Sequence, residues 1–326
     1  MTKLKSLAIV TVLALMLGSA QDVRAEKQPF EAWMNDMKTQ AMSEGVSEAL
    51  VNRAFNSNLA PHQRVIELDK KQPEGTMTFV EYRTKIVNQT RINKGREMYA
   101  KHLPMLEEVG AKYGIQPQYI VALWGIETNY GSNTGGFDVV RALATLAWDG
   151  RRATFFTKEL MTALKIIDAG HIALEDMSGS WAGAMGQNQF MPSSFMSFAQ
   201  DYNEDGRKDI WSSLPDVFAS TANYLTRSGW NDGERWGRQV ILPAGFNAAL
   251  VDKDVKKPLA EWQRLGVRAV GNQALPVADF NASIVAPDGV TGPAYLVYNN
   301  FHTIKKWNRS DYFAVSVGLL ADAIAQ

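Results

Sequence analysis

The sequence predicts an α+β protein that is mainly helical. Apolar residues recur at helical spacing in segments between residues 30 and 225, which indicates a largely helical body. Over about 239–297 the pattern changes to short apolar runs broken by Pro and Gly, and this is typical of a few strands. Helical spacing returns at 301–324. We therefore expect a helical N-terminal part, a core at about 100–235 and a small β-containing insertion at about 239–300.

Composition excludes several classes of protein. The 326 residues carry 34 Lys and Arg against 34 Asp and Glu, so the formal net charge is zero and a general nucleic-acid binder is not expected. The chain has no cysteine. This excludes disulfides, thiolate metal sites, a Cys nucleophile and the lipid-modified cysteine of bacterial lipoproteins.

Residues 1–25 have the pattern of a secretory signal. Lys3 and Lys5 supply a positive start, and 7–17 form an apolar run too short to span a bilayer comfortably. Small residues follow, so we expect cleavage after Ala20 or after Ala25. The alternative is a membrane anchor that stays uncut. Residues 26–326 contain no second apolar span, so we expect the mature protein to be exported, soluble and not lipid-anchored.

The stretch 116–131 is the most informative part of the chain. Gly114 is expected to end one helix, Pro117 to begin the next and Gly131 to stop it. The helix between them is apolar on all sides, and such helices are normally buried.

One acid lies on this apolar helix. Ile120, Leu123 and Trp124 share a face, and Glu127 is the next residue in that helical series. Burial raises the pKa of a carboxyl group, and an acid still protonated near neutral pH suits general acid catalysis. The alternative is a buried glutamate that is only hydrogen-bonded, which is the commoner case for a lone Glu.

A second motif begins at Ser180. The small residues of Gly183-Ala184-Met185-Gly186 allow a close backbone approach. Ser180 and Gln189 add neutral hydrogen-bonding groups, which suit a sugar better than a phosphate or a metal. The alternative is a Gly-rich contact between two helices.

These two motifs together carry a resemblance. Residues 125–131, followed some fifty residues later by 183–186 and then 189–192, resemble the membrane-bound lytic transglycosylase B family of lysozyme-like enzymes that cleave bacterial peptidoglycan. The likeness covers roughly 30–325. It implies a lysozyme-like α+β core with added helical and small sheet elements, and a catalytic region that fills 26–326.

The resemblance also implies a reaction. The family cuts the β-1,4 bond between N-acetylmuramic acid and N-acetylglucosamine and leaves a 1,6-anhydromuramoyl end. Glu127 would act first as acid and then as base, with no cofactor needed for the chemistry. Peptidoglycan glycan strands would be the partner and the periplasm the location. We expect a monomer, and the sequence identifies no partner among cell-wall synthesis or division proteins.

Further residues match family positions near the sugar groove. Ser180 is the candidate to hold the N-acetyl group and Gln189 to bind the sugar beside it. The remaining matches are Tyr82, Asn223, Tyr224, Trp307 and Phe313. The family often has Tyr near the position of Phe313, and core packing is the commoner role of any single aromatic residue.

A polar loop starts at Asp201. Its acids and amide alternate, with Gly206 sixth, which fits the start of an EF-hand type calcium loop. Lys208 stands at the usual apolar position and Ser212 where the bidentate Glu belongs, and the family closes a variant loop with a later acid. The resemblance implies a structural calcium ion held by Asp201, Asn203, Asp205, Arg207 and Asp216. From the pattern alone, a solvated Asp/Gly turn is the alternative.

Two other functions stay open at this point. A hydrolytic lysozyme-type muramidase would need a second carboxylate near Glu127, since most glycosidases use two. Asp138 and Asp149 are the nearest candidates, and both are expected in polar loops. A non-catalytic glycan-binding or scaffolding protein would keep the aromatic residues without needing the acid.

Overall fold

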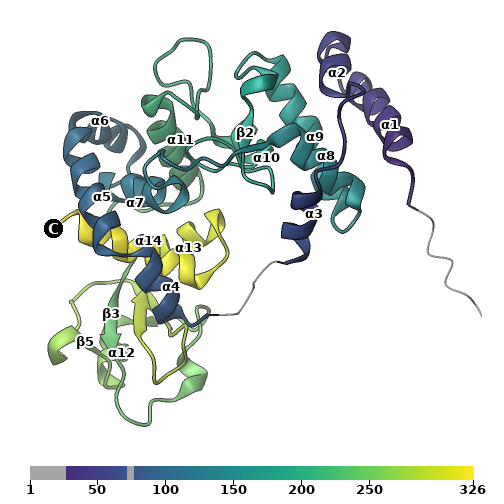
Figure 1. Cartoon of the computed structure of the whole chain (residues 1–326). Helices are drawn as coiled ribbons and strands as arrows, with labels where there is room; N and C mark the ends of the chain where they lie inside the picture. Colours follow the sequence, from purple (N-terminus) through teal and green to yellow (C-terminus); the bar gives the residue numbers. More distant parts are fainter. Residues whose placement is uncertain (1–26, 72–76) are drawn as a thin grey trace, which may run out of the picture.

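The computed structural model describes residues 27–71 and 77–326, and the predicted signal at 1–25 lies outside them (Figure 1). The predicted mainly helical α+β class is confirmed. The helices are α1 (Phe30–Ser43), α2 (Glu48–Ala54), α3 (Gln63–Lys70), α4 (Phe79–Ile86), α5 (Gln89–Lys101), α6 (Leu103–Tyr113), α7 (Pro117–Thr128), α8 (Val139–Asp149), α9 (Ala153–Asp168), α10 (Pro192–Phe198), α11 (Leu214–Arg227), α12 (Leu259–Arg264), α13 (Asn299–Trp307) and α14 (Asp311–Ile324), with short 3-10 helices η1 (Leu174–Asp176), η2 (Ala248–Leu250) and η3 (Val270–Asn272). The strands are β1 (Phe137–Asp138), β2 (Ser178–Gly179), β3 (Gly237–Ile241), β4 (Lys257–Pro258), β5 (Arg268–Ala269), β6 (Asn281–Val285) and β7 (Ala294–Val297).

A five-stranded antiparallel sheet forms the β unit in the order β4-β6-β7-β3-β5. All the side chains of strand β7 are buried, and successive side chains point to opposite sides, so both faces of the strand are covered. Leu296 packs with α12 in one apolar cluster. Tyr295 and Val297 pack in another, which also contains α7 and α14 residues. The sheet is thus joined to the helical body through β7.

The helical body has two apolar cores. One gathers residues of α1, α2, α8, α9 and α10. The other gathers residues of α6, α7, α11 and α14. In Figure 1, α13 and α14 lie between these upper helices and the β unit below. No helix in the described ranges is long and apolar enough to cross a membrane.

A two-stranded ribbon replaces part of the predicted loop at 132–138. Phe137 pairs with Gly179 and Asp138 with Ser178. The pairing partner lies about forty residues later, so local pattern gave no signal for it. The ribbon holds the start of the Ser180 loop beside the start of α8.

Helix α7 begins at Pro117 as predicted but ends at Thr128, before Gly131. Asn129 and Tyr130 turn the chain with left-handed backbone angles, φ 50° and 60°. Asn tolerates this conformation better than most residues, so it ends the helix without a glycine. The prediction that Gly131 stops the helix was wrong.

The helical spacing predicted at 301–324 corresponds to two helices, α13 and α14, which are separated at Asn308. Asn308 is extended, with φ −141° and ψ 123°, and its side chain accepts a 3.0 Å hydrogen bond from the N–H of Ser310. Ser310 then caps α14 by accepting from the N–H of Phe313 at 3.4 Å. Asn and Ser favour such caps over helix interiors. The break leaves Trp307 at the end of α13.

Candidate active site

Glu127 lies in the last turn of α7. The residue keeps some exposed surface, although neighbouring atoms crowd its carboxylate. Burial raises the pKa of Glu127 to about 7, and the hydrogen bond from Trp307 opposes this in part. The predicted desolvation effect is therefore present, and Glu127 can give or take a proton near neutral pH.

Trp307 contacts the acid directly. Its Nε1 donates a 2.8 Å hydrogen bond to Oε1 of Glu127. The indole ring packs against Tyr224 and Phe190, with centroid separations of 4.7 and 5.1 Å. The Tyr224 hydroxyl donates to the carbonyl of Lys306 at 2.7 Å, which ties this cluster to the end of α13. Trp307 therefore orients Glu127, a role that the sequence did not indicate.

Tyr82 comes from α4 and lies close to Glu127. Burial raises the pKa of Tyr82, the negative charge of Glu127 raises it further, and Arg91 opposes both. Tyr82, which the resemblance places near the sugar groove, therefore lies near the acid. Its side chain is partly exposed, so its phenol group can reach a ligand.

Gln187 ties the loop after β2 to α7. Its Oε1 accepts a 2.8 Å hydrogen bond from Nε1 of Trp124, and its Nε2 donates to the carbonyl of Trp211 at 2.9 Å. The Thr128 hydroxyl donates to the carbonyl of Gln187 at 3.1 Å. Because Trp124 and Thr128 flank Glu127 on α7, these bonds hold the loop against the helix turn that carries the acid.

The close approach predicted for the glycines of this loop is confirmed. A Cβ added at Gly183 would lie 2.3 Å from Cδ2 of Leu143. One added at Gly186 would lie 2.7 Å from the carbonyl oxygen of Ile210. Gly186 also has a left-handed φ of 62°, which glycine adopts without strain.

Ser180 and Gln189 are both partly exposed on this loop. The Ser180 hydroxyl accepts from two N–H groups of its own loop, at 3.0 and 3.3 Å. Nε2 of Gln189 donates to the carbonyls of Thr134 and Gly186, both at 3.0 Å. Across the described residues no hydrogen bond joins either side chain to Glu127.

Two predicted sugar contacts occupy structural positions. Asn223 is 9% exposed and donates to the carbonyl of Phe198 at 2.8 Å. Phe313 is 5% exposed and packs in the core. The preceding residue, Tyr312, lies beside Tyr82, with 5.7 Å between the two ring centroids. The family's preference for Tyr near this position was the signal for Tyr312.

Neither predicted alternative acid approaches Glu127. Asp138 caps α8 by accepting from the N–H of Arg141 at 2.9 Å. Asp149 pairs with Lys27 at 3.1 Å. Among the described residues, no acid contributes to the pKa shift of Glu127. The geometry therefore offers one carboxylate, where a two-carboxylate hydrolase needs two.

The Asp201 loop is folded on its own acids. Asp201 accepts from the N–H groups of Asp205 and Gly206 at 3.1 and 2.9 Å, and Asp205 accepts from that of Arg207 at 2.9 Å. Over 27–71 and 77–326, no three or more His, Asp or Glu side chains are grouped as metal ligands. The predicted calcium ligands are thus not gathered in a coordination shell.

Asp216 is the buried acid of this loop. Its carboxylate accepts from the N–H groups of Tyr202, Asn203 and Asp209 at 2.8, 3.4 and 2.8 Å. Burial raises the pKa of Asp216, these bonds lower it, and the charge of Asp201 raises it. The two acids therefore lie near enough to repel, which a cation between them would relieve.

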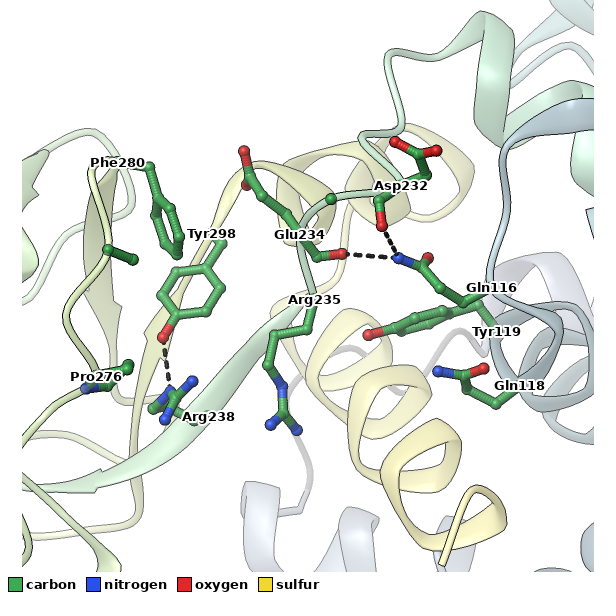
Figure 2. Close-up of a pocket in the computed structure, with 12 residues that line it drawn as sticks. Gln116, Gln118, Tyr119, Asp232, Glu234, Arg235, Arg238, Pro276, Phe280 and Tyr298 are labelled. Atoms are coloured by element: carbon green, nitrogen blue, oxygen red, sulfur yellow. Dashed lines mark hydrogen bonds between the residues drawn. The ribbon is translucent and has the colours of Figure 1, made fainter. Parts of the chain in front are cut away.

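A cavity of about 360 Å³ lies at the opposite end of α7, beside the β unit (Figure 2). Gln116 donates to the carbonyl of Glu234 at 3.2 Å on one side, and Nε of Arg238 donates to the Tyr298 hydroxyl at 2.7 Å on the other. None of the site residues predicted from the sequence lines this cavity. Tyr119, the lining residue of α7 nearest to Glu127, precedes it by eight positions, about 12 Å along the helix.

Comparison with known proteins places this geometry in a class. A family model described as "Transglycosylase SLT domain" matches residues 29–322. The membrane-bound lytic murein transglycosylase B of Escherichia coli (strain K12) is 31% identical over 266 residues, which cover 78% of this chain and 70% of that protein.

Solved structures agree with the sequence match. SltB3 from Pseudomonas aeruginosa, in complex with NAG-anhNAM-pentapeptide, is 43% identical with a TM-score of 0.88, and the match covers 91% of this chain and 80% of that one. SltB1 from the same organism is 30% identical with a TM-score of 0.79, over 90% and 98% of the two chains. The Escherichia coli lytic transglycosylase Slt35, in complex with calcium, is 27% identical with a TM-score of 0.76, over 90% and 92%.

The fold and the sequence matches are those of a lytic transglycosylase, an enzyme that cleaves glycan in the manner of a lyase. The resemblance noted from the sequence and the lysozyme-like fold are confirmed. The chain belongs to the transglycosylase SLT domain family, whose model spans nearly all of its described residues.

Proposed function

We propose that this enzyme cleaves the β-1,4 bond between N-acetylmuramic acid and N-acetylglucosamine in peptidoglycan and leaves a 1,6-anhydromuramoyl end. One observation carries the proposal: Glu127 is a single acid with a pKa of about 7, and no second carboxylate acts on it within the described chain. The crystal structure of SltB3 in complex with NAG-anhNAM-pentapeptide supports the same product.

In the first half of the reaction, protonated Glu127 donates its proton to the glycosidic oxygen as the bond to C1 breaks. A pKa of about 7 leaves a large fraction of the acid protonated at neutral pH. The substrate's own N-acetyl group stabilises the oxocarbenium-like centre at C1. Ser180 is our candidate to hold that group, with Gln189 beside it.

In the second half, the Glu127 carboxylate takes the proton from the C6 hydroxyl of muramic acid, and that oxygen attacks C1. The ring closes, no water is consumed and Glu127 returns to its protonated state. The indole N–H of Trp307 stabilises the carboxylate at this stage because it donates to Oε1. One residue thus serves both steps.

Mass analysis of the products tests this reaction. Purified sacculi digested by the enzyme should yield fragments with anhydro ends, lighter by one water than hydrolysis products. Fragments with reducing ends would show a muramidase instead. An absence of soluble fragments would leave a glycan-binding protein.

We also propose that the protein is exported to the periplasm, with cleavage after Ala20 or Ala25. The positive and apolar pattern of the first 25 residues supports this. N-terminal sequencing of the exported protein should begin at Gln21 or Glu26. A sequence that began at Met1 would show an uncut segment.

We further propose that the loop from Asp201 to Asp216 takes a structural calcium ion. The proximity of these two acids supports it, as does the calcium complex of Slt35. To bind the ion, some carboxylate oxygens must lose the hydrogen bonds that they accept here from backbone N–H groups. The ion would stabilise the loop and takes no part in the proposed chemistry.

A further inference from the structure

Helix α4 carries Tyr82 but is only eight residues long. A helix of this length is marginal in water unless other parts of the molecule hold it. Its own N-terminus is closed by a capping box between Thr78 and Glu81, in which the N–H of Glu81 donates to the Thr78 hydroxyl at 3.2 Å. Such a cap stabilises the helix only modestly. The position of α4 relative to Glu127 must come from contacts with other elements.

The β unit supplies the most direct of these contacts. Asp288, in the turn between β6 and β7, accepts two hydrogen bonds from the first turn of α4. The N–H of Phe79 donates to its Oδ1 at 2.6 Å, and the N–H of Val80 donates to its Oδ2 at 3.0 Å. A carboxylate at the N-terminus of a helix also complements the helix dipole.

Asp288 also meets the aromatic residues that surround Tyr82. Burial and the nearby charge of Asp288 raise the pKa of Tyr312, and the Tyr312 ring centroid lies 5.7 Å from that of Tyr82 and 5.2 Å from that of Phe79. One residue further along α4 than Tyr82, Nη1 of Arg83 donates to the β7 hydroxyl of Tyr295 at 3.2 Å. The residues before and after Tyr82 in α4 therefore contact the β unit or α14.

The turn that presents Asp288 is closely built. Gly289 has a left-handed φ of 84°, and its N–H donates to the carbonyl of Ala286 at 2.8 Å. A Cβ added at Gly292 would lie 2.8 Å from Cβ of Asp288. The turn therefore folds back on Asp288 and limits where its carboxylate can point.

From these contacts we propose that Asp288 is a positioning residue for the reaction, which holds Tyr82 beside Glu127 by fixing the N-terminus of α4. The inference rests on the proposed function, because it assigns the β unit a part in building that site. Asp288 touches neither the acid nor the reacting atoms.

Displacement of α4 should change the pH dependence of kcat/KM, whereas a simple loss of stability should not. Tyr82 lies near enough to Glu127 for the charge of the acid to act on its phenol, and the other groups that act on this pair are Trp307 on the acid and Arg91 on the phenol. If α4 moves away, water reaches Glu127 and its pKa falls toward that of an exposed glutamate. The loss of kcat/KM at alkaline pH should then begin at lower pH.

The test compares Asp288→Ala with Thr78→Ala in the full chain. Thr78→Ala is the matched control because it removes the local cap of the same helix and leaves the β unit contact intact. Both variants are assayed for anhydromuropeptide release well below their melting temperatures. We expect Asp288→Ala to lower kcat/KM by about 10- to 100-fold, as for a displaced site group, and to move its alkaline limb to lower pH. Thr78→Ala should lower the melting temperature without moving that limb.

Asp288→Asn is the second variant, in case the alanine variant does not fold. It keeps the shape and one acceptor, so it should shift the profile in the same direction by less. Wild-type pH profiles for both Asp288 variants would overturn the proposal, and so would an equal shift in Thr78→Ala. Wild-type enzyme that released no anhydro ends would instead overturn the proposed function, so the two failures are distinguishable.

Discussion

Trp307 and Glu127 are 180 positions apart in the chain, yet Nε1 of Trp307 lies 2.8 Å from Oε1 of Glu127. This one donor favours the carboxylate, while burial favours the neutral acid. The opposition of the two effects sets the pKa of Glu127 near 7. An acid that must be protonated in one half-reaction and ionised in the next gains from such a balance.

Replacing Trp307 by Phe should move the pH profile. The variant keeps an aromatic ring against Tyr224 but removes the donor, so the pKa of Glu127 should rise above 7. The alkaline limb of kcat/KM should therefore shift to higher pH, and kcat should fall because the carboxylate is less stabilised. Rates of anhydromuropeptide release between pH 5 and 9 give this measurement.

Trp211→Phe is the matched control for that variant. Among the described residues the buried indole nitrogen of Trp211 has no hydrogen-bond partner, so its removal breaks no bond there. Its profile should match the wild type. A Trp307→Phe profile that also matched the wild type would show that the hydrogen bond does not tune the acid.

Replacing Glu127 by Gln should abolish most of the activity while the fold survives. The amide keeps size and hydrogen bonding but cannot exchange the proton. A positioned acid or base contributes about 100- to 10,000-fold, and since one residue serves both steps we expect a loss toward the upper end. Release of anhydromuropeptides measures the loss, with circular dichroism as the control for folding.

Asp138→Asn is the companion variant, since Asp138 caps a helix away from the acid. It should keep most of its activity. A folded Glu127→Gln enzyme near the wild-type rate would contradict the mechanism. Equal loss in Asp138→Asn would indicate a hydrolase with two carboxylates.

The same Gln variant should alter how stability depends on pH. Folding raises the pKa of Glu127 from its unfolded value of 4.5 to about 7. The wild-type protein therefore carries no free-energy penalty from Glu127 below pH 4.5, and its stability falls progressively as the pH rises to about 7. The full penalty is on the order of 3 kcal/mol. Melting temperatures should show Glu127→Gln gaining on the wild type between pH 4.5 and 7. A difference that stays constant over this range would argue against a raised pKa.

Calcium should stabilise the protein if the Asp201 loop binds it. An ion that binds only the folded state raises the melting temperature by mass action. Asp205→Ala should lose this response. In the absence of calcium the substitution should cost little stability, because Asp205 is exposed. Asp216→Ala should lose the response and also destabilise the metal-free protein, since it leaves three N–H groups without their acceptor. A melting curve unchanged by excess calcium would leave the loop as a plain turn.

Several elements of the site were predictable from short stretches of sequence. The apolar character of 117–126 and the position of Glu127 in the same helical series required only helical spacing. The glycines at 183 and 186 predicted a close approach, because no other residue leaves that space. The strands β3, β6 and β7 lay where apolar runs were broken by turn residues.

Local features were therefore predictable from the sequence: which segments are helical, which helix is buried and which acid it carries. The partners of that acid depend on the tertiary structure. Trp307 reaches Glu127 from the end of α13, where the chain breaks at Asn308, and Asp288 reaches Phe79 across 209 positions. Spacing along one element records which face a residue occupies but not what packs on that face. Those partners follow from how the helices and the β unit assemble around α7, where burial and one donated hydrogen bond set the pKa of Glu127.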